Sequence, residues 1–190
     1  MKTVITLLAT FAVILFIVFA LPVSGEEAVY DGVLRLHVLA DSDSTEHQTE
    51  KLLVRDAILS AYGEDFSALQ SREEAVAFAE AHLDDIKALT ETVTDSPVAV
   101  SLEEEWFDTR AYDGFTLPAG RYLSLTVHVG SGKGQNFFCM LYPALCVEPA
   151  KGERLSVSDA KLNEAEYLLI TDGGYGLKFR TLELLSSLFE

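Results

Sequence analysis

The residues best suited to chemistry in this chain of 190 residues lie in one stretch, GSGKGQNFFCMLYPALC, at positions 130–146. A lysine between two glycines suggests a phosphate-binding loop. A P-loop, however, requires a glycine five positions before Gly132 and a Ser or Thr after Lys133. Val127 and Gly134 stand at those positions instead. The spacing therefore predicts a glycine-rich turn between two strands, because glycine supplies the positive φ that such turns need.

The same stretch holds both cysteines of the chain, Cys139 and Cys146. They could form a disulfide, remain as two buried thiols, or supply a nucleophile beside a histidine. A disulfide needs the two Cα atoms within about 7 Å, and Tyr142-Pro143 offers a turn that would fold the chain back. A catalytic thiol would need a neighbouring base that lowers its pKa.

A second polar concentration, RLHVLADSDSTEHQTEK, spans positions 35–51. Asp41, Asp43, His47 and Glu50 could line a metal site, and the last two share a helix face. The same residue types are ordinary in a turn that leads into a helix. No tight ligand spacing of the H-E-x-x-H kind is present, nor a paired-carboxylate or Ser-His-Asp signature. We therefore expect no metal and no cofactor.

The start of the chain predicts export. Lys2 precedes an uncharged run, VITLLATFAVILFIVFAL, at 4–21. A basic start, an apolar run and a region of small residues are typical of a signal peptide, although the run is also about long enough to span a membrane. Residues 1–25 are thus predicted as a signal peptide or an N-terminal membrane anchor, and 26–190 as a single extracytoplasmic domain. An oxidising compartment favours the disulfide among the three interpretations of the cysteines.

The charge balance restricts the partners. Without Lys2, 13 basic residues stand against 30 acidic ones, so the net charge moves from −16 to −17. Such a domain repels nucleic acid and anionic lipid headgroups. We expect no nucleic-acid partner, and contact with a membrane only through residues 4–21 if that segment is uncleaved.

The apolar pattern predicts mixed secondary structure in the first half of the domain. Residues 33–40 are nearly all apolar and predict a buried strand. A helix is expected over 45–62, with Asp43 or Ser44 as its N-cap and Gly63 as its end. Its predicted apolar face consists of Leu53, Val54, Ala57, Ile58 and Ala61.

Later segments complete the fold class. Ser71 and Glu74 form a capping box that opens a helix to about residue 93, with His82 on its apolar stripe. Strands are predicted at 98–107, 121–129 and 137–142, the last two as a hairpin, with a further strand at 166–171 and a C-terminal helix. This pattern indicates an α+β fold, an antiparallel sheet with two to three helices packed on one face.

Three segments in order, RLHVLADSDS, HQTEKLLVRDAIL and GKGQNFFCMLYPALC, resemble the stage II sporulation protein R family of endospore-forming bacteria over residues 33–147. The resemblance implies a protein made in the forespore and secreted across the forespore membrane into the intermembrane space. There it would act as a non-catalytic activator of a membrane-embedded aspartic-type peptidase, which processes the sigma-E precursor. The alternative is an exported hydrolase or thiol enzyme that uses Cys139 and a histidine.

The matching segments and the aromatic residues beside them supply the candidates for partner contact. They are Arg35, His37, Ser42, Asp43, Arg55, Lys133, Gln135, Asn136, Phe137 and Phe138. Phe137 and Phe138 are successive residues of one strand, so their side chains point to opposite faces. One ring can then pack in the core while the other is exposed beside the polar loop, or both are buried.

The chain departs from the family pattern at four places. Asp41 stands where Asn is expected, His47 where Asp is expected, Glu50 where an apolar residue is expected, and Phe137-Phe138 where tryptophans are expected. These differences put residue-level transfer in doubt around 41–50.

Overall fold

The computed structural model describes residues 26–112 and 115–144, together with positions 2–4, 6–7, 9–11 and 13. Among these residues, no helix combines the length and the apolar character needed to cross a membrane. Most of the predicted export segment at 4–21 lies outside the described residues, as do Cys146, the predicted strand at 166–171 and the C-terminal helix.

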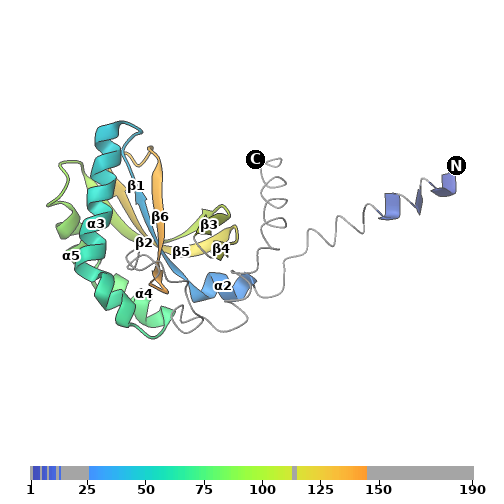
Figure 1. Ribbon diagram of the computed structural model, residues 1–190, viewed down its shortest axis with the longest axis horizontal. Helices are drawn as coiled ribbons and strands as arrows, with labels where there is room; N and C mark the ends of the chain where they lie inside the picture. Colours follow the sequence, from blue (N-terminus) through green and yellow to red (C-terminus); the bar gives the residue numbers. More distant parts are fainter. Residues whose placement is uncertain are drawn as a thin grey trace.

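The described elements form a four-stranded sheet with helices packed against it (Figure 1). In chain order they are α2 Glu26–Gly32, β1 Leu34–Leu39, α3 Thr45–Ala68, α4 Arg72–Ala81, α5 Leu83–Thr90, β2 Val98–Phe107, β3 Arg110–Tyr112, β4 Phe115–Leu117, β5 Gly120–Val129 and β6 Asn136–Tyr142. The sheet order is β2-β5-β1-β6, and β3 and β4 pair separately. The predicted α+β class is confirmed. The sheet is mixed rather than wholly antiparallel, because β1 runs parallel to β5, whereas β1 with β6 and β2 with β5 pair antiparallel.

The predicted hairpin of 121–129 with 137–142 is wrong. β1 lies between these two strands, so that Leu36 is in register with Leu125 on one side and with Cys139 on the other. The loop after β5 therefore carries the chain past β1 to its far edge. β1 is buried along almost its whole length, and its interior position explains the nearly continuous apolar sequence there.

Helices α3, α4 and α5 lie together on one face of the sheet (Figure 1). The core between them contains Leu34, Leu36, Val38, Val54, Ile58, Phe66, Ala75, Ala79, Ile86, Leu125, Val127, Val129 and Leu141. The strands contribute alternate residues to this core because successive side chains point to opposite faces. The predicted strand at 121–129 is confirmed, and its side chains alternate: Leu125, Val127 and Val129 face the helices, whereas Tyr122, Ser124 and Thr126 are buried on the second face.

α3 begins as predicted but ends later. The Ser44 hydroxyl caps it by accepting the amide of His47 at 3.2 Å. Gly63 does not end the helix, which runs on to Ala68. Phe66 is almost fully buried in the core beyond the glycine, and its packing outweighs the roughly 1 kcal/mol that glycine costs inside a helix.

The predicted apolar face of α3 is only partly correct. Val54 and Ile58 are fully buried, but Leu53 is 49% exposed and its neighbour Leu52 is 39% exposed. The helix therefore presents leucines to its surface as well as to the core.

The predicted second helix divides into α4 and α5 at His82. The Ser71 cap is confirmed, since its hydroxyl accepts the Glu74 amide at 3.2 Å. At the break, His82 Nδ1 lies 2.7 Å from the Phe78 carbonyl oxygen, which would otherwise accept the amide of His82 in a continuous helix. That amide bonds to Ala79 O instead. The histidine side chain thus competes with the helix for one carbonyl and ends it.

Candidate functional site

Two segments that are far apart in the sequence meet beyond the end of β1. They are the turn at 40–44 and the loop at 130–135, and together we call them the loop junction. Gly134 N donates to Ala40 O at 2.8 Å, Ser131 N to Asp41 Oδ1 at 2.5 Å, and Gln135 N to Asp43 Oδ1 at 2.6 Å. The junction therefore joins two segments that carry four of the ten predicted partner-binding residues, Ser42, Asp43, Lys133 and Gln135.

The glycines of the loop have a steric role. Gly130 and Gly132 adopt positive φ values of 64° and 66°, a region that side-chain-bearing residues enter at a cost. Gly134 has a different constraint, because a Cβ placed there would lie 2.3 Å from the backbone oxygen of Ser42. The prediction of a glycine-rich turn in place of a phosphate loop is confirmed, although the turn joins β5 to β6 across β1.

Side chains of α3 hold the loop junction in place through hydrogen bonds. Lys51, which is only 6% exposed, donates from Nζ to Gln135 O at 2.9 Å and to Gln48 Oε1 at 2.5 Å. Gln48 Nε2 donates to Ser42 O at 2.9 Å. Burial lowers the pKa of Lys51, and the nearby charge of Arg55 lowers it further. Lys51 thus links α3 to the loop inside the fold, and its ammonium group is not presented at the surface.

The acidic and hydroxyl residues of the turn are likewise engaged within the protein. His47 Nδ1 lies 2.7 Å from Ser42 Oγ and 3.3 Å from Asp41 Oδ2. The hydrogen bond from the Ser131 amide, aided by the Ser131 hydroxyl, holds the pKa of Asp41 below its usual range. Ser42 and Asp43, which were predicted as partner contacts, therefore form hydrogen bonds within the protein that stabilise the turn and the loop.

Three predicted contact residues remain exposed on the loop: Lys133, Gln135 and Asn136. Their backbone is fixed by the bonds just described, so their side chains project from a rigid base. Such preorganisation reduces the entropy lost when a partner binds.

The two phenylalanines do point to opposite faces, as predicted. Phe137 packs against the helix-side core, with the Arg55 guanidinium 4.9 Å from its ring centroid. Phe138 lies on the second face and stacks on His37 with a centroid distance of 4.6 Å. Both rings are half-buried, so neither of the two expected arrangements is fully realised.

The second face of β1 carries two buried polar residues. Arg35 is fully buried, with its guanidinium carbon 3.9 Å from the Phe107 ring centroid. His37 places Nδ1 2.9 Å from Glu105 Oε2, and the Thr126 hydroxyl donates to the other oxygen of Glu105. Burial raises the pKa of Glu105, but the hydrogen bonds from His37 and Thr126 outweigh it, and the net pKa is lowered.

A hollow of about 500 Å³ opens beside the loop junction, and we call it the aromatic hollow. It is lined by His37, Trp106, Phe107, Asp108, Arg110, Gln135, Asn136 and Phe138. Four of these were predicted as partner contacts. The other four, Trp106, Phe107, Asp108 and Arg110, were not predicted. The sequence signal that could have indicated them is the only tryptophan of the chain, which charged residues follow closely at the end of a strand.

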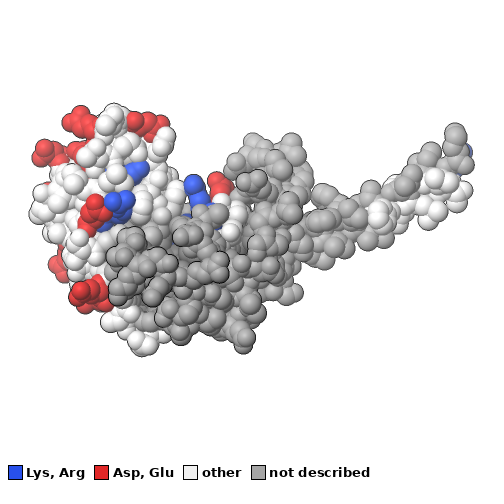
Figure 2. Space-filling view, in the orientation of Figure 1, with Lys and Arg blue, Asp and Glu red and all other residues white. Residues whose placement is uncertain are grey.

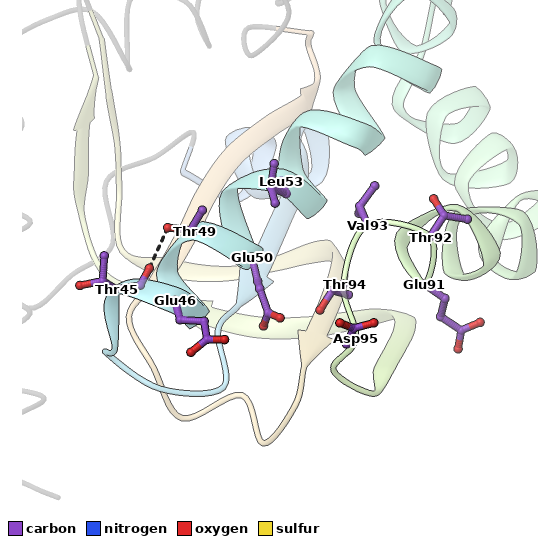
Figure 3. A pocket seen from close by; sticks show the side chains of 10 residues that line it. All are labelled: Thr45, Glu46, Thr49, Glu50, Leu53, Glu91, Thr92, Val93, Thr94 and Asp95. Carbon is purple, nitrogen blue, oxygen red and sulfur yellow. Dashed lines mark hydrogen bonds between the residues drawn. The ribbon is translucent and has the colours of Figure 1, made fainter.

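A second hollow lies between the start of α3 and the turn after α5 (Figure 3). Four carboxylates line it, from Glu46, Glu50, Glu91 and Asp95, and acidic side chains gather at this end of the domain in Figure 2. Glu50 accepts the Ser96 hydroxyl at 3.0 Å. Within the described ranges, no three His, Cys, Asp or Glu side chains form a group that could hold a metal ion.

The state of Cys139 counts against the thiol-enzyme alternative, which needs a free thiol beside a histidine. Cys139 is disulfide-bonded and packs against the helix-side core, whereas His37 is directed to the second face with Phe138. The partner sulfur lies outside the described residues, and the pairing with Cys146 stays a prediction.

Together these features define an α+β domain with a four-stranded main sheet, a firmly held polar loop and an adjoining aromatic hollow. The chain belongs to the stage II sporulation protein R family, whose model matches residues 30–151, and this membership gives it a role in sporulation. It is 30% identical over 137 residues to stage II sporulation protein R of Bacillus subtilis (strain 168), covering 69% of this chain and 61% of that relative. No solved structure matches the chain.

Proposed function

We propose that this protein is an exported sporulation signal that activates a membrane-embedded aspartic-type peptidase, which then processes the sigma-E precursor of the mother cell. It would cross the forespore membrane, act from the intermembrane space, and bind the extracytoplasmic part of the peptidase without catalysing a reaction itself. Family membership over residues 30–151 supports this function. The match spans 61% of the curated relative's length, so the proposal concerns the shared region.

The observation that supports the contact surface is the loop junction. It fixes the backbone of 130–135 through bonds to the turn at 40–44 and leaves Lys133, Gln135 and Asn136 exposed. Polar groups around a partly covered aromatic residue are typical of an interface anchor and its rim. A lysine among them suits a partner surface with acidic or carbonyl groups.

Co-expression of the full chain with the peptidase and a sigma-E precursor reporter tests this function. The triple alanine variant of Lys133, Gln135 and Asn136 should reduce precursor processing at least tenfold, while the melting temperature stays nearly unchanged because the three side chains are exposed. Full processing by this variant would rule out the loop as the receptor contact.

A matched control is available on the helical side. Triple alanine replacement of Glu64, Glu80 and Lys87, which lie on α3, α4 and α5, removes the same number of side chains outside the loop junction and outside the lining of the aromatic hollow. It should leave processing unchanged. Loss of processing in both triple variants would indicate a general defect in export or folding.

Export is tested separately by N-terminal sequencing of the mature protein. Cleavage of the predicted signal peptide should give a chain that begins near Glu26. Retention of Met1 in the membrane fraction would indicate the anchored form, and a domain found in the cytosol would contradict export.

A further inference from the structure

His37, a residue that lines the aromatic hollow, has a buried ring nitrogen that is not hydrogen-bonded within the described structure. His37 lines the hollow, its side chain is only 7% exposed, and its Nε2 has no hydrogen-bond partner. Buried polar atoms in folded proteins are almost always paired, so an exception calls for an explanation in terms of function. A partner that supplies the missing bond would remove the desolvation cost of this atom.

The hydrogen bond at His37 Nδ1 determines whether the group that pairs with Nε2 must be a donor or an acceptor. Nδ1 lies 2.9 Å from a carboxylate oxygen of Glu105, and an ionised carboxylate only accepts hydrogen bonds. In the neutral imidazole, Nδ1 therefore carries the proton, and Nε2 presents a lone pair. The missing partner is then a hydrogen-bond donor, and a carboxylate or a backbone carbonyl does not meet this need.

Guanidinium groups over the aromatic walls of the hollow disfavour a cation as the donor, although the Asp108 carboxylate also lines it. Two rings that line it already have guanidinium groups over them, Arg35 at 3.9 Å from the Phe107 centroid and Arg110 at 4.8 Å from the Phe138 centroid. A further positive charge would be repelled by both. A neutral group with an aromatic body instead suits a hollow lined by Trp106, Phe107 and Phe138, because aromatic rings pack well in stacked or edge-on arrangements.

We propose that the aromatic hollow receives a neutral aromatic side chain of a partner polypeptide, a tyrosine or a tryptophan, whose O–H or N–H donates to His37 Nε2. This proposal rests on the proposed function, because it names the chemistry by which the partner would be recognised beside the loop junction. Trp106, 59% exposed, forms an outer wall of the hollow, and Gln135 and Asn136 provide polar groups at its edge.

The purified full-length protein, mixed with small probe molecules, tests the proposal without the peptidase. Phenol and indole carry the donor, whereas anisole and N-methylindole have nearly the same shape without it. Trp106 is the only tryptophan, so its emission, excited at the red edge of its absorption, reports occupancy of the hollow for phenol and anisole. Phenol should bind roughly 3- to 10-fold more tightly than anisole, the effect of one net hydrogen bond.

Nitrogen-15 NMR of the histidine ring provides the second measurement, and it also compares indole with N-methylindole. The unprotonated Nε2 resonance of His37 should shift on addition of phenol or indole and not on addition of either methylated analogue. Equal binding of phenol and anisole, or binding that leaves the His37 resonance unmoved, would overturn the proposal.

A pair of variants separates the acceptor from the aromatic wall. His37→Phe keeps a ring in the stack but removes the acceptor, so phenol should lose its preference over anisole. His128→Phe on β5 is the control, since His128 does not line the hollow, and the preference should persist. Should His37→Phe fail to fold, the unmodified protein with its four probes still decides the question.

Two further outcomes are informative. A change of Trp106 emission with protein concentration alone would show that a second copy of this chain fills the hollow, contrary to the proposal. Probe binding is measured on the purified protein without the peptidase, so a failure to bind phenol does not change the result of the processing experiment. Loss of processing in the loop variant would support the proposed function, and preferential binding of phenol would separately support this inference.

Discussion

Replacement of Gly134 by alanine tests the loop junction most directly. The added Cβ would lie 2.3 Å from the Ser42 carbonyl oxygen and 2.5 Å from its carbon. Both are backbone atoms, which have no rotamer through which to move away. The loop must therefore shift, and the bonds from Gly134 N to Ala40 O and from Gln135 N to Asp43 are the first to be strained.

The magnitude follows from these contacts. Overpacking of this kind costs about 1–3 kcal/mol, and each of two weakened hydrogen bonds adds about 1 kcal/mol. The lower entropy of the unfolded chain with alanine offsets roughly 0.5–1 kcal/mol. We expect Gly134→Ala to reduce the free energy of unfolding by about 2–4 kcal/mol, a loss that a domain of ordinary stability survives.

Urea denaturation of the purified domain measures this change, and amide hydrogen exchange locates it. The amides of residues 134 and 135 should exchange faster, while those of β1 should keep their protection. Lys133→Ala in the same loop is the control and should change stability by less than about 0.5 kcal/mol, since the side chain is exposed. An unchanged free energy with both loop amides still protected would refute the close approach of the two segments.

Three further predictions concern bonds within the fold. Glu105→Gln should cost about 1–2 kcal/mol at neutral pH, because it weakens the charged acceptor of two hydrogen bonds. The folded pKa of Glu105 lies below its usual value of 4.5, so its contribution is present above that pH and is lost as the pH falls below it; denaturation curves of the two proteins should converge in acid. Cys139→Ser and Cys146→Ser should each cost roughly 2–3 kcal/mol, with the double variant no worse, and a non-reducing mass measurement that finds two free thiols would exclude their bridge. Ser71→Ala should lower the free energy of unfolding by about 1 kcal/mol, as loss of an N-cap does, and restoration by Ser71→Asp would show that the cap is the cause.

The sequence determined the features that depend on neighbours along the chain. The caps at Ser44 and Ser71 follow from a side-chain oxygen placed next to unpaired amides of a helix start. The buried strand β1 and the alternation of β5 follow from the period of their apolar residues. The opposite directions of Phe137 and Phe138 follow from strand geometry alone.

Where the sequence signals were wrong, one particular contact in the folded protein outweighed the pattern along the chain. Gly63 indicates a helix end, but Phe66 beyond it is buried in the core. The continuous stripe through His82 indicates one helix, but its ring bonds to the Phe78 carbonyl and divides it.

Only the tertiary structure decided which strands are neighbours, and with them the candidate site. The apolar pattern of β6 is compatible with pairing to either β5 or β1, because the side chains of a strand alternate between the two faces whichever strand lies beside it. Its actual place beside β1 brings the loop at 130–135 onto the turn at 40–44 and sets Phe138 on His37. Such pairing depends on the burial of whole faces by elements far apart in the chain. No local spacing encodes that burial, and the loop junction and the aromatic hollow therefore emerge only in the folded protein.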